Sequence, residues 1–84
     1  MAQFKASIYI KLKKGVNDPQ GLAVVGGLKQ LGFDTVSSAR VGKVIDINLE
    51  AESEDEANNN LNQMCEQLLA NPVIEDFEII ISSD

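Results

Sequence analysis

Two segments of the chain, residues 4–12 and 44–51, alternate between apolar and polar residues. A period of two places successive side chains on opposite faces of a β-strand. The apolar positions are Phe4, Ala6, Ile8, Ile10 and Leu12 in the first segment, and Ile45, Ile47, Leu49 and Ala51 in the second. We therefore expect two strands, each with one face buried beneath other elements and one face exposed.

Helix signals follow the first strand. Asp18 is suited to accept hydrogen bonds from the free amide groups at a helix start, and Pro19 suits the first helical position. Gly32 would end the helix. The expected buried stripe is Leu22, Val25, Leu28 and Leu31. Gly26 and Gly27 each cost about 1 kcal/mol relative to alanine inside a helix. Either the helix tolerates them, or another backbone, such as that of a partner, approaches closely there.

A second helix should begin near residue 54 and end before Pro72. Ser53 and Glu56 form a capping box, and Asn71 followed by Pro72 stops the helix. Its buried stripe should be Ala57, Leu61, Met64, Cys65 and Leu68. The acids Glu54, Asp55 and Glu56 suit the positive end of the helix dipole better than general acid–base work. We expect Cys65 to be a small core residue, since a nucleophile needs a base and the chain has no histidine.

The remaining segments complete the order β-α-β-β-α-β in a single domain spanning residues 1–84. Residues 35–41 form a weakly patterned strand, Gly42 and Lys43 a tight turn, and Phe77, Ile79 and Ile81 mark a last strand. Two right-handed β-α-β crossovers then predict an α+β, ferredoxin-like sandwich. Its four-stranded antiparallel sheet would have both helices on one face and the strand order last, first, third, second.

A chain of 84 residues has a thin core and often needs a disulfide, a metal or a second copy of itself. One cysteine and no histidine exclude an internal disulfide and a cysteine- or histidine-rich metal site, so we expect a homodimer or a higher homo-oligomer.

No apolar run approaches the ~20 residues of a membrane span, and no signal peptide is evident, so a cytoplasmic location is expected. The net charge of -6 disfavours nucleic acid and anionic membranes.

Charge is divided between the two halves of the chain. All seven basic residues lie at or before Lys43, and eleven of the thirteen acids follow it. The expected topology gathers Lys11, Lys13, Lys14, Arg40 and Lys43 at one end of the sheet, and Glu50, Glu52, Glu54, Asp55 and Glu56 at the other. The basic end is then a solvated rim, a docking surface, or an anion site at the first helix start. Tyr9 is the only aromatic expected on the open sheet face, which argues against RNA binding.

Four segments resemble the PurS family, the small subunits of bacterial phosphoribosylformylglycinamidine synthase. They are residues 14–21, 31–33, 40–43 and 65–78, in matching order along nearly the whole chain. The last is the most specific: it ends a helix, stops it at Asn71-Pro72 and starts a strand. The chain departs from the family pattern at Gly26-Gly27 and at the asparagine run of residues 58–60.

The resemblance implies a subunit without catalytic residues that bridges a glutaminase, PurQ, and a synthetase, PurL. The complex would convert formylglycinamide ribonucleotide (FGAR) to its amidine (FGAM) in purine biosynthesis, and the PurS copies would dimerise. ATP, magnesium and glutamine would be used by the complex, with no cofactor, metal or catalytic site on this chain. The residues we expect to contact partners are Lys13, Lys14, Asp18, Gln20, Arg40, Gly42 and Lys43.

Two other classes share the expected element order. An amino-acid-sensing regulatory domain of the ACT type would also dimerise and would bind a small ligand near residues 15–21. An acylphosphatase-like enzyme would need an arginine in the loop after the first strand. That loop carries Lys13 and Lys14, whereas the only arginine is Arg40.

Overall fold

The computed structural model describes residues 1–83 of the chain. Its centre is a three-stranded antiparallel sheet in the order β2-β1-β3. The strands are β1 (Ala2–Leu12), β2 (Lys43–Ala51) and β3 (Glu75–Ser83). Ile8 of the central strand lies opposite Ile45 on one side and Ile79 on the other. The expected alternation is therefore confirmed in all three strands, and their apolar positions share one face of the sheet.

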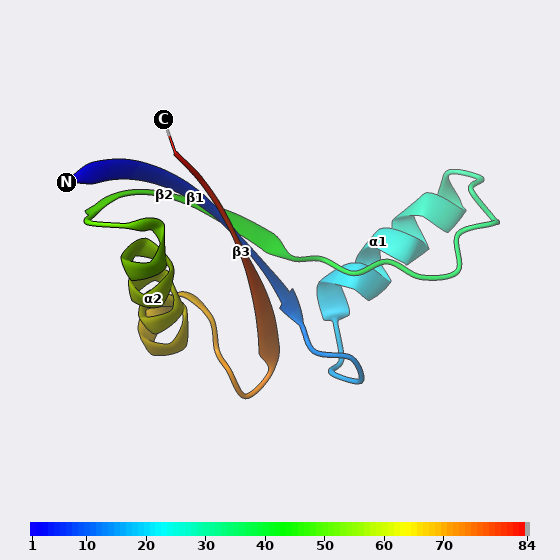
Figure 1. Ribbon diagram of the computed structural model, residues 1–84. Helices are drawn as coiled ribbons and strands as arrows, with labels where there is room; N and C mark the ends of the chain where they lie inside the picture. Colours follow the sequence, from blue (N-terminus) through cyan, green and yellow to red (C-terminus); the bar gives the residue numbers. More distant parts are fainter. Residues whose placement is uncertain (84) are drawn as a thin grey trace.

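One helix covers that apolar face. Helix α2 (Glu54–Met64) continues into a π-helical turn, η1 (Cys65–Leu69), and both lie beneath one end of the sheet (Figure 1). The largest fully buried side chains are Ile8, Ile10, Leu61 and Cys65. The predicted capping is present, because Ser53 Oγ accepts a 3.1 Å hydrogen bond from the Glu56 amide. The Glu56 carboxylate in turn accepts one from the Glu52 amide at 3.2 Å.

The π-helical turn corrects one predicted core position. Ala57, Leu61 and Cys65 are buried as expected, but Leu68 is 82% exposed. The Ala70 amide donates to the Cys65 carbonyl, five residues back, which closes a wider turn than that of an α-helix. The widening rotates the later side chains away from the stripe that a regular helix would keep facing the sheet. Leu68 therefore points to solvent.

Helix α1 (Pro19–Gln30) forms where it was predicted, but it does not cover the sheet. It lies beyond the opposite end of the sheet from α2 (Figure 1). Gly21 is its only buried residue, while Leu22 is 65% exposed and Leu31, just after the helix, is 74% exposed. The expectation of two helices on one face and a buried α1 stripe is therefore wrong for this chain taken alone. We call α1 together with residues 31–42 the arm.

The predicted strand at residues 35–41 is also absent from the described chain. Residues 36–42, the last part of the arm, lead back to β2 as an irregular segment, so the described sheet has three strands instead of the expected four. The pattern of this segment is weak, and its Val41 amide donates to the side chain of Asp18. A segment that follows α1 away from the sheet has no neighbouring strand with which to form a ladder.

The arm makes the molecule long. Its principal extents are 52 × 28 × 14 Å, and the Cα radius of gyration is 16.6 Å. A compact domain of this length would have a radius of gyration of about 12 Å. Within residues 1–83, no helix has the length and apolar character needed to cross a membrane.

Candidate interaction site

The arm leaves the sheet at a compact junction, which we call the root. It comprises the end of β1 at residues 12–13, the start of α1 at residues 18–21 and the returning residues 39–42. The chain passes through the root twice, once outward after β1 and once inward before β2 (Figure 1). The root therefore holds segments that lie about twenty residues apart in sequence.

Asp18 is the central polar residue of the root. It is only 6% exposed. Its Oδ1 atom accepts a hydrogen bond from the Gly21 amide and its Oδ2 atom one from the Val41 amide, both at 2.9 Å. Because the carboxylate already occupies the start of α1, the expected alternative of an anion site at this helix start is not supported.

The environment of Asp18 favours its charged form. The hydrogen bond from the Val41 amide, and then that from the Gly21 amide, lower the pKa of Asp18 below its ordinary value. Burial acts in the opposite direction, and the positive charge of Arg40 lowers the pKa further. The carboxylate is therefore ionised at neutral pH and held by donors from two segments.

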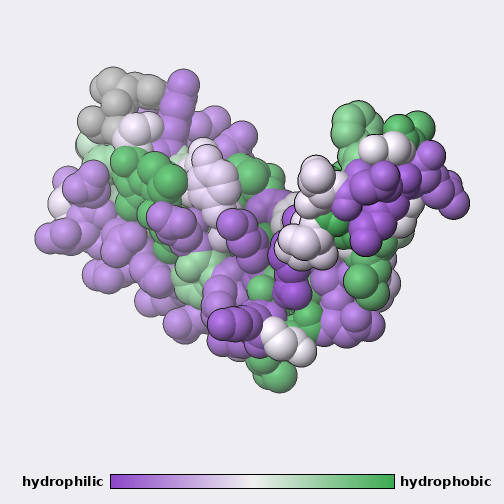
Figure 2. All heavy atoms as spheres, turned by 90° about the vertical axis from the view of Figure 1, so that its right-hand side faces the viewer, coloured by the Kyte–Doolittle hydropathy of each residue, from purple (hydrophilic) through white to green (hydrophobic). Residues whose placement is uncertain are grey.

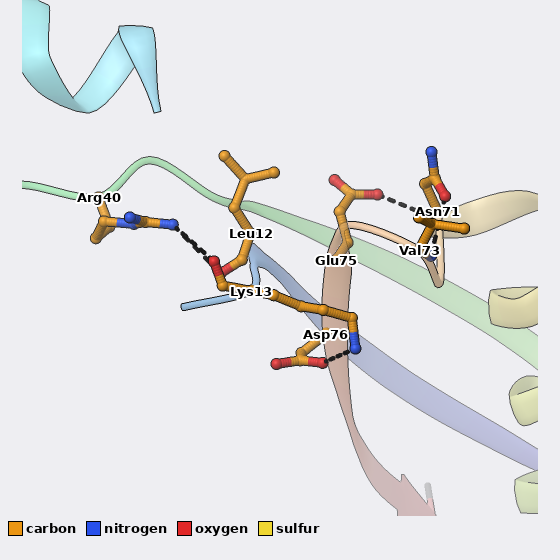
Figure 3. A network of polar contacts seen from close by, with 7 residues as sticks. All are labelled: Leu12, Lys13, Arg40, Asn71, Val73, Glu75 and Asp76. Carbon is orange, nitrogen blue, oxygen red and sulfur yellow. Dashed lines mark hydrogen bonds and ion pairs between the residues drawn. The ribbon is translucent and has the colours of Figure 1, made fainter. Parts of the chain in front are cut away.

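Arg40 connects the returning segment to β1. Its Nη2 atom donates to the carbonyl oxygens of Leu12 at 3.5 Å and Lys13 at 3.3 Å (Figure 3). Its Nε atom lies 3.7 Å from Asp18 Oδ2, and its side chain is 45% exposed. Each contact of Arg40 is long and individually weak, whereas the two bonds that Asp18 accepts are short.

Two glycines allow the backbones of the root to approach closely. A Cβ atom at Gly21 would collide with the carbonyl oxygen of Ala39. A Cβ atom at Gly42 would lie 2.6 Å from the carbonyl oxygen of Ile10. These positions accept no side chain without a backbone shift. Gly26 and Gly27, by contrast, have open space around them in the described chain.

Most of the predicted contact residues meet at the root. A hollow of about 280 Å³ there is lined by Ile10, Leu12, Asp18, Gln20, Val41, Gly42, Lys43 and Glu75. Four of the seven predicted residues are among them. Arg40 instead lines an adjacent hollow of about 330 Å³ beside Ser37 and Ser38. Lys14 lies apart, exposed in the turn between β1 and α1.

The basic end of the sheet also carries acids at the start of β3, beside the lysines of β1, as the alternation of the last strand predicts. Lys13 Nζ forms a 2.9 Å ion pair with Asp76 Oδ1 at the start of β3 (Figure 3). Both side chains are largely solvated, so this pair contributes at most about 1 kcal/mol. The antiparallel pairing of β1 with β3 brings Asp76 opposite Lys11, so the expected topology already contained this signal.

The arm presents apolar side chains that no other part of residues 1–83 covers. Its exposed members are Leu22, Val24, Leu31 and Phe33. Figure 2, which looks onto the arm side of the molecule, shows hydrophobic atoms at the surface among hydrophilic ones. Isolated exposed apolar residues are ordinary, but four on one short helix and its exit indicate a surface that a partner covers.

The described residues offer little for catalysis. Cys65 is fully buried, and desolvation, followed by the nearby charge of Glu66, raises the pKa of its thiol. Such a thiol is a poor nucleophile. Within residues 1–83, no group of three histidine, cysteine, aspartate or glutamate side chains is placed to hold a metal ion.

Comparison with known proteins gives one consistent result. The family model for PurS, described as phosphoribosylformylglycinamidine (FGAM) synthase, matches residues 5–83. The phosphoribosylformylglycinamidine synthase subunit PurS of Synechocystis sp. is 50% identical over 74 residues, which is 88% of this chain and 74% of that protein. The subunit of the same name from Methanocaldococcus jannaschii is 46% identical over 76 residues, which is 90% of this chain and 92% of that protein.

Solved structures show the same similarity in three dimensions. The crystal structure of Methanocaldococcus jannaschii PurS matches with a TM-score of 0.86 and 42% identity, covering 96% of this chain and 98% of that one. A chain in the structure of PurLQS from Thermotoga maritima matches with a TM-score of 0.88 and 33% identity, covering 98% of this chain and all of that one (100%).

Proposed function

The chain belongs to the PurS family, and from that membership we propose that it is the assembly subunit of a phosphoribosylformylglycinamidine synthase. In this role it joins a glutaminase, PurQ, to a synthetase, PurL, in the cytoplasm. The complex converts FGAR to FGAM in purine biosynthesis with ATP, magnesium and ammonia drawn from glutamine. The sites for these compounds then lie on the partner subunits, and this chain is not catalytic by itself.

The observation that carries the proposal is the match to a chain of PurLQS. It extends over nearly the whole of both chains. The chemistry of the site agrees with an assembly role. The polar groups of the root bond to one another, and the arm exposes apolar side chains that a partner protein could cover.

The proposal includes self-association through the arm. An uncovered α1 and a long molecule are expected of a chain whose core is completed by a second copy. Residues 36–42 have no ladder partner in the described chain, and a sheet edge of the second copy would supply one. That addition would produce the fourth strand of a ferredoxin-like sheet.

The proposal also assigns the partner contacts to the basic end. Lys14 and Lys43 are the best positions for a test because both are exposed. Arg40 is a poor choice, since its guanidinium bonds carbonyl groups of its own chain and its loss would disturb the root. Lys29, exposed on the arm, is the matched control for a change of charge.

The decisive experiment is reconstitution with the PurL and PurQ proteins of the same organism. We expect glutamine-dependent FGAM formation only when this chain is added, and co-elution of the three proteins with glutamine, magnesium and ADP present. Lys14→Glu combined with Lys43→Glu should reduce that activity at least about tenfold, equivalent to ~1.4 kcal/mol of binding. Lys29→Glu should reduce it less.

Two results would count against these assignments. Full glutamine-dependent activity without the chain would remove the assembly role. Full activity of the Lys14→Glu, Lys43→Glu variant, with the assembly role intact, would remove only the contact assignment. Thermal stabilisation of the isolated chain by a free amino acid would favour the ligand-sensing class instead.

A further inference from the structure

The arm is attached to the sheet through very few groups. Among the described residues of α1 only Gly21 is buried, and the helix does not pack on the face that α2 covers (Figure 1). Among the described residues, the side-chain bonds from the arm to the end of β1 come from Arg40, and Asp18 holds the two segments of the arm together beside it. The orientation of the arm therefore depends on a small and identifiable set of contacts.

Asp18 joins the two segments that form the arm. One carboxylate oxygen accepts from the first turn of α1 and the other from Val41 on the returning segment, each at 2.9 Å. A single buried carboxylate thus closes the loop that contains the whole arm. Its two bonds are charge-assisted and are shielded from water, which makes them stronger than neutral surface bonds.

Arg40 joins the closed loop to β1. Its guanidinium reaches the Leu12 and Lys13 carbonyls at 3.5 and 3.3 Å, where β1 ends (Figure 3). Its Nε atom also faces Asp18 at 3.7 Å. The planar guanidinium presents several donors in a fixed geometry, so one side chain can bind both the carbonyls and the carboxylate.

Two glycines allow backbone segments to pack closely at the same junction. Gly21 lies against the Ala39 carbonyl and Gly42 against the Ile10 carbonyl, with no room for a Cβ atom at either position. Close backbone approach resists sliding of α1 along the returning segment. The polar bonds then resist opening of the loop at its root.

We propose that Asp18 and Arg40 form a latch that holds the arm at a set angle to the sheet. Arg40 is a positioning residue in this scheme, and its contribution to assembly is indirect. The latch presents the apolar side chains of the arm in one orientation to whatever covers them. This inference rests on the geometry of the root and does not require the proposed function.

The test is amide hydrogen exchange followed by NMR on the native assembly. Arg40→Met keeps the apolar stem and removes the donors and the charge. We expect the Gly21 and Val41 amides, which Asp18 binds, to exchange about tenfold faster, because the root opens more often once Arg40 no longer bonds the Leu12 and Lys13 carbonyls. The exchange rates of the sheet amides around Ile8 should not change. Lys29→Met, the control, should change neither set.

A conservative variant separates geometry from charge. Arg40→Lys retains the positive charge beside Asp18 but lacks the planar set of donors. We expect exchange at Gly21 and Val41 to be intermediate between the native protein and Arg40→Met. Asp18→Asn should accelerate the same two amides without requiring any change at Arg40.

Two outcomes would overturn the latch. Unchanged exchange at Gly21 and Val41 in both Arg40→Met and Asp18→Asn would mean that these side chains do not hold the root. Equal acceleration of the root amides and the Ile8 ladder, in Arg40→Lys as well as Arg40→Met, would mean that Arg40 supports the whole fold and has no particular role in the arm.

Discussion

At the scale of single residues, Asp18 shows how one carboxylate organises distant backbone. The sequence indicates a helix cap from Asp18 and Pro19 alone, and the structure confirms the bond to Gly21. The second bond, to Val41, lies 23 residues away and has no local signal. A capping residue therefore also serves as the tie between the outgoing and returning segments of the arm.

The lowered pKa of Asp18 predicts a specific dependence of stability on pH. A group whose pKa is lower in the folded protein stabilises the fold above its ordinary pKa, about 4 for aspartate. That stabilisation is lost as the pH falls through the lowered value. Asp18→Asn should therefore be less stable than the native protein at pH 7, and the difference should shrink below about pH 4. Urea unfolding at several pH values measures the free energy of unfolding of both proteins. A difference between them that stays constant across the pH range would contradict the prediction.

At the scale of elements, α1 contains glycines in two different situations. Gly21 faces the Ala39 carbonyl, whereas Gly26 and Gly27 face open space in the described chain. The sequence left open whether the glycine pair is merely tolerated or permits close approach of a backbone. Residues 1–83 make no such approach to Gly26 or Gly27, and a neighbour supplied by a partner is the alternative that a substitution can test.

Alanine substitutions in α1 distinguish these situations. Gly21→Ala should destabilise the chain by roughly 1–3 kcal/mol, because the new methyl group forces backbone apart. Gly26→Ala, its matched control, should stabilise the monomer by about 0.5–1 kcal/mol, because alanine is the better helix former. Chemical denaturation provides both values, and a neutral Gly21→Ala would show that the root is looser than described. Weaker self-association of a stable Gly26→Ala would reveal a partner backbone at that position.

At the scale of the whole molecule, the extended shape is the main departure from a self-contained domain. The radius of gyration of 16.6 Å exceeds the ~12 Å expected of a compact chain of this length. The excess comes from the arm, which carries exposed Leu22 and Leu31. Covering these side chains requires surface that the described chain does not itself provide.

The whole-molecule prediction concerns self-association. Leu22→Glu combined with Leu31→Glu should shift the protein to monomer in sedimentation experiments, because the buried interface would then contain unpaired charges. The thermal midpoint of the native protein should rise with protein concentration, and that of the variant should not. Leu68→Glu, which changes an exposed leucine outside the arm, should behave as the native protein. A native protein that is monomeric at all concentrations would contradict the proposed role of the arm.

Local chemistry determined much of this protein. The alternation in residues 4–12 and 44–51 predicted two strands and the buried face of each. Ser53 and Glu56 predicted the start of α2. Both patterns depend on backbone geometry over only a few residues. The segments at residues 14–21, 31–33, 40–43 and 65–78 also sufficed to indicate the family.

Tertiary structure decided where α1 lies, whether residues 35–41 pair, and which way Leu68 points. The apolar stripe of α1 shows that the helix is to be covered, but it does not identify the covering surface. Residues 36–42 follow an irregular path, and Arg40 bonds the end of β1, about 27 residues away in sequence. A repeating pattern of neighbouring residues cannot predict such a contact. These features depend on which distant groups meet, and that is settled by packing among segments and, for the arm, by surfaces beyond the chain.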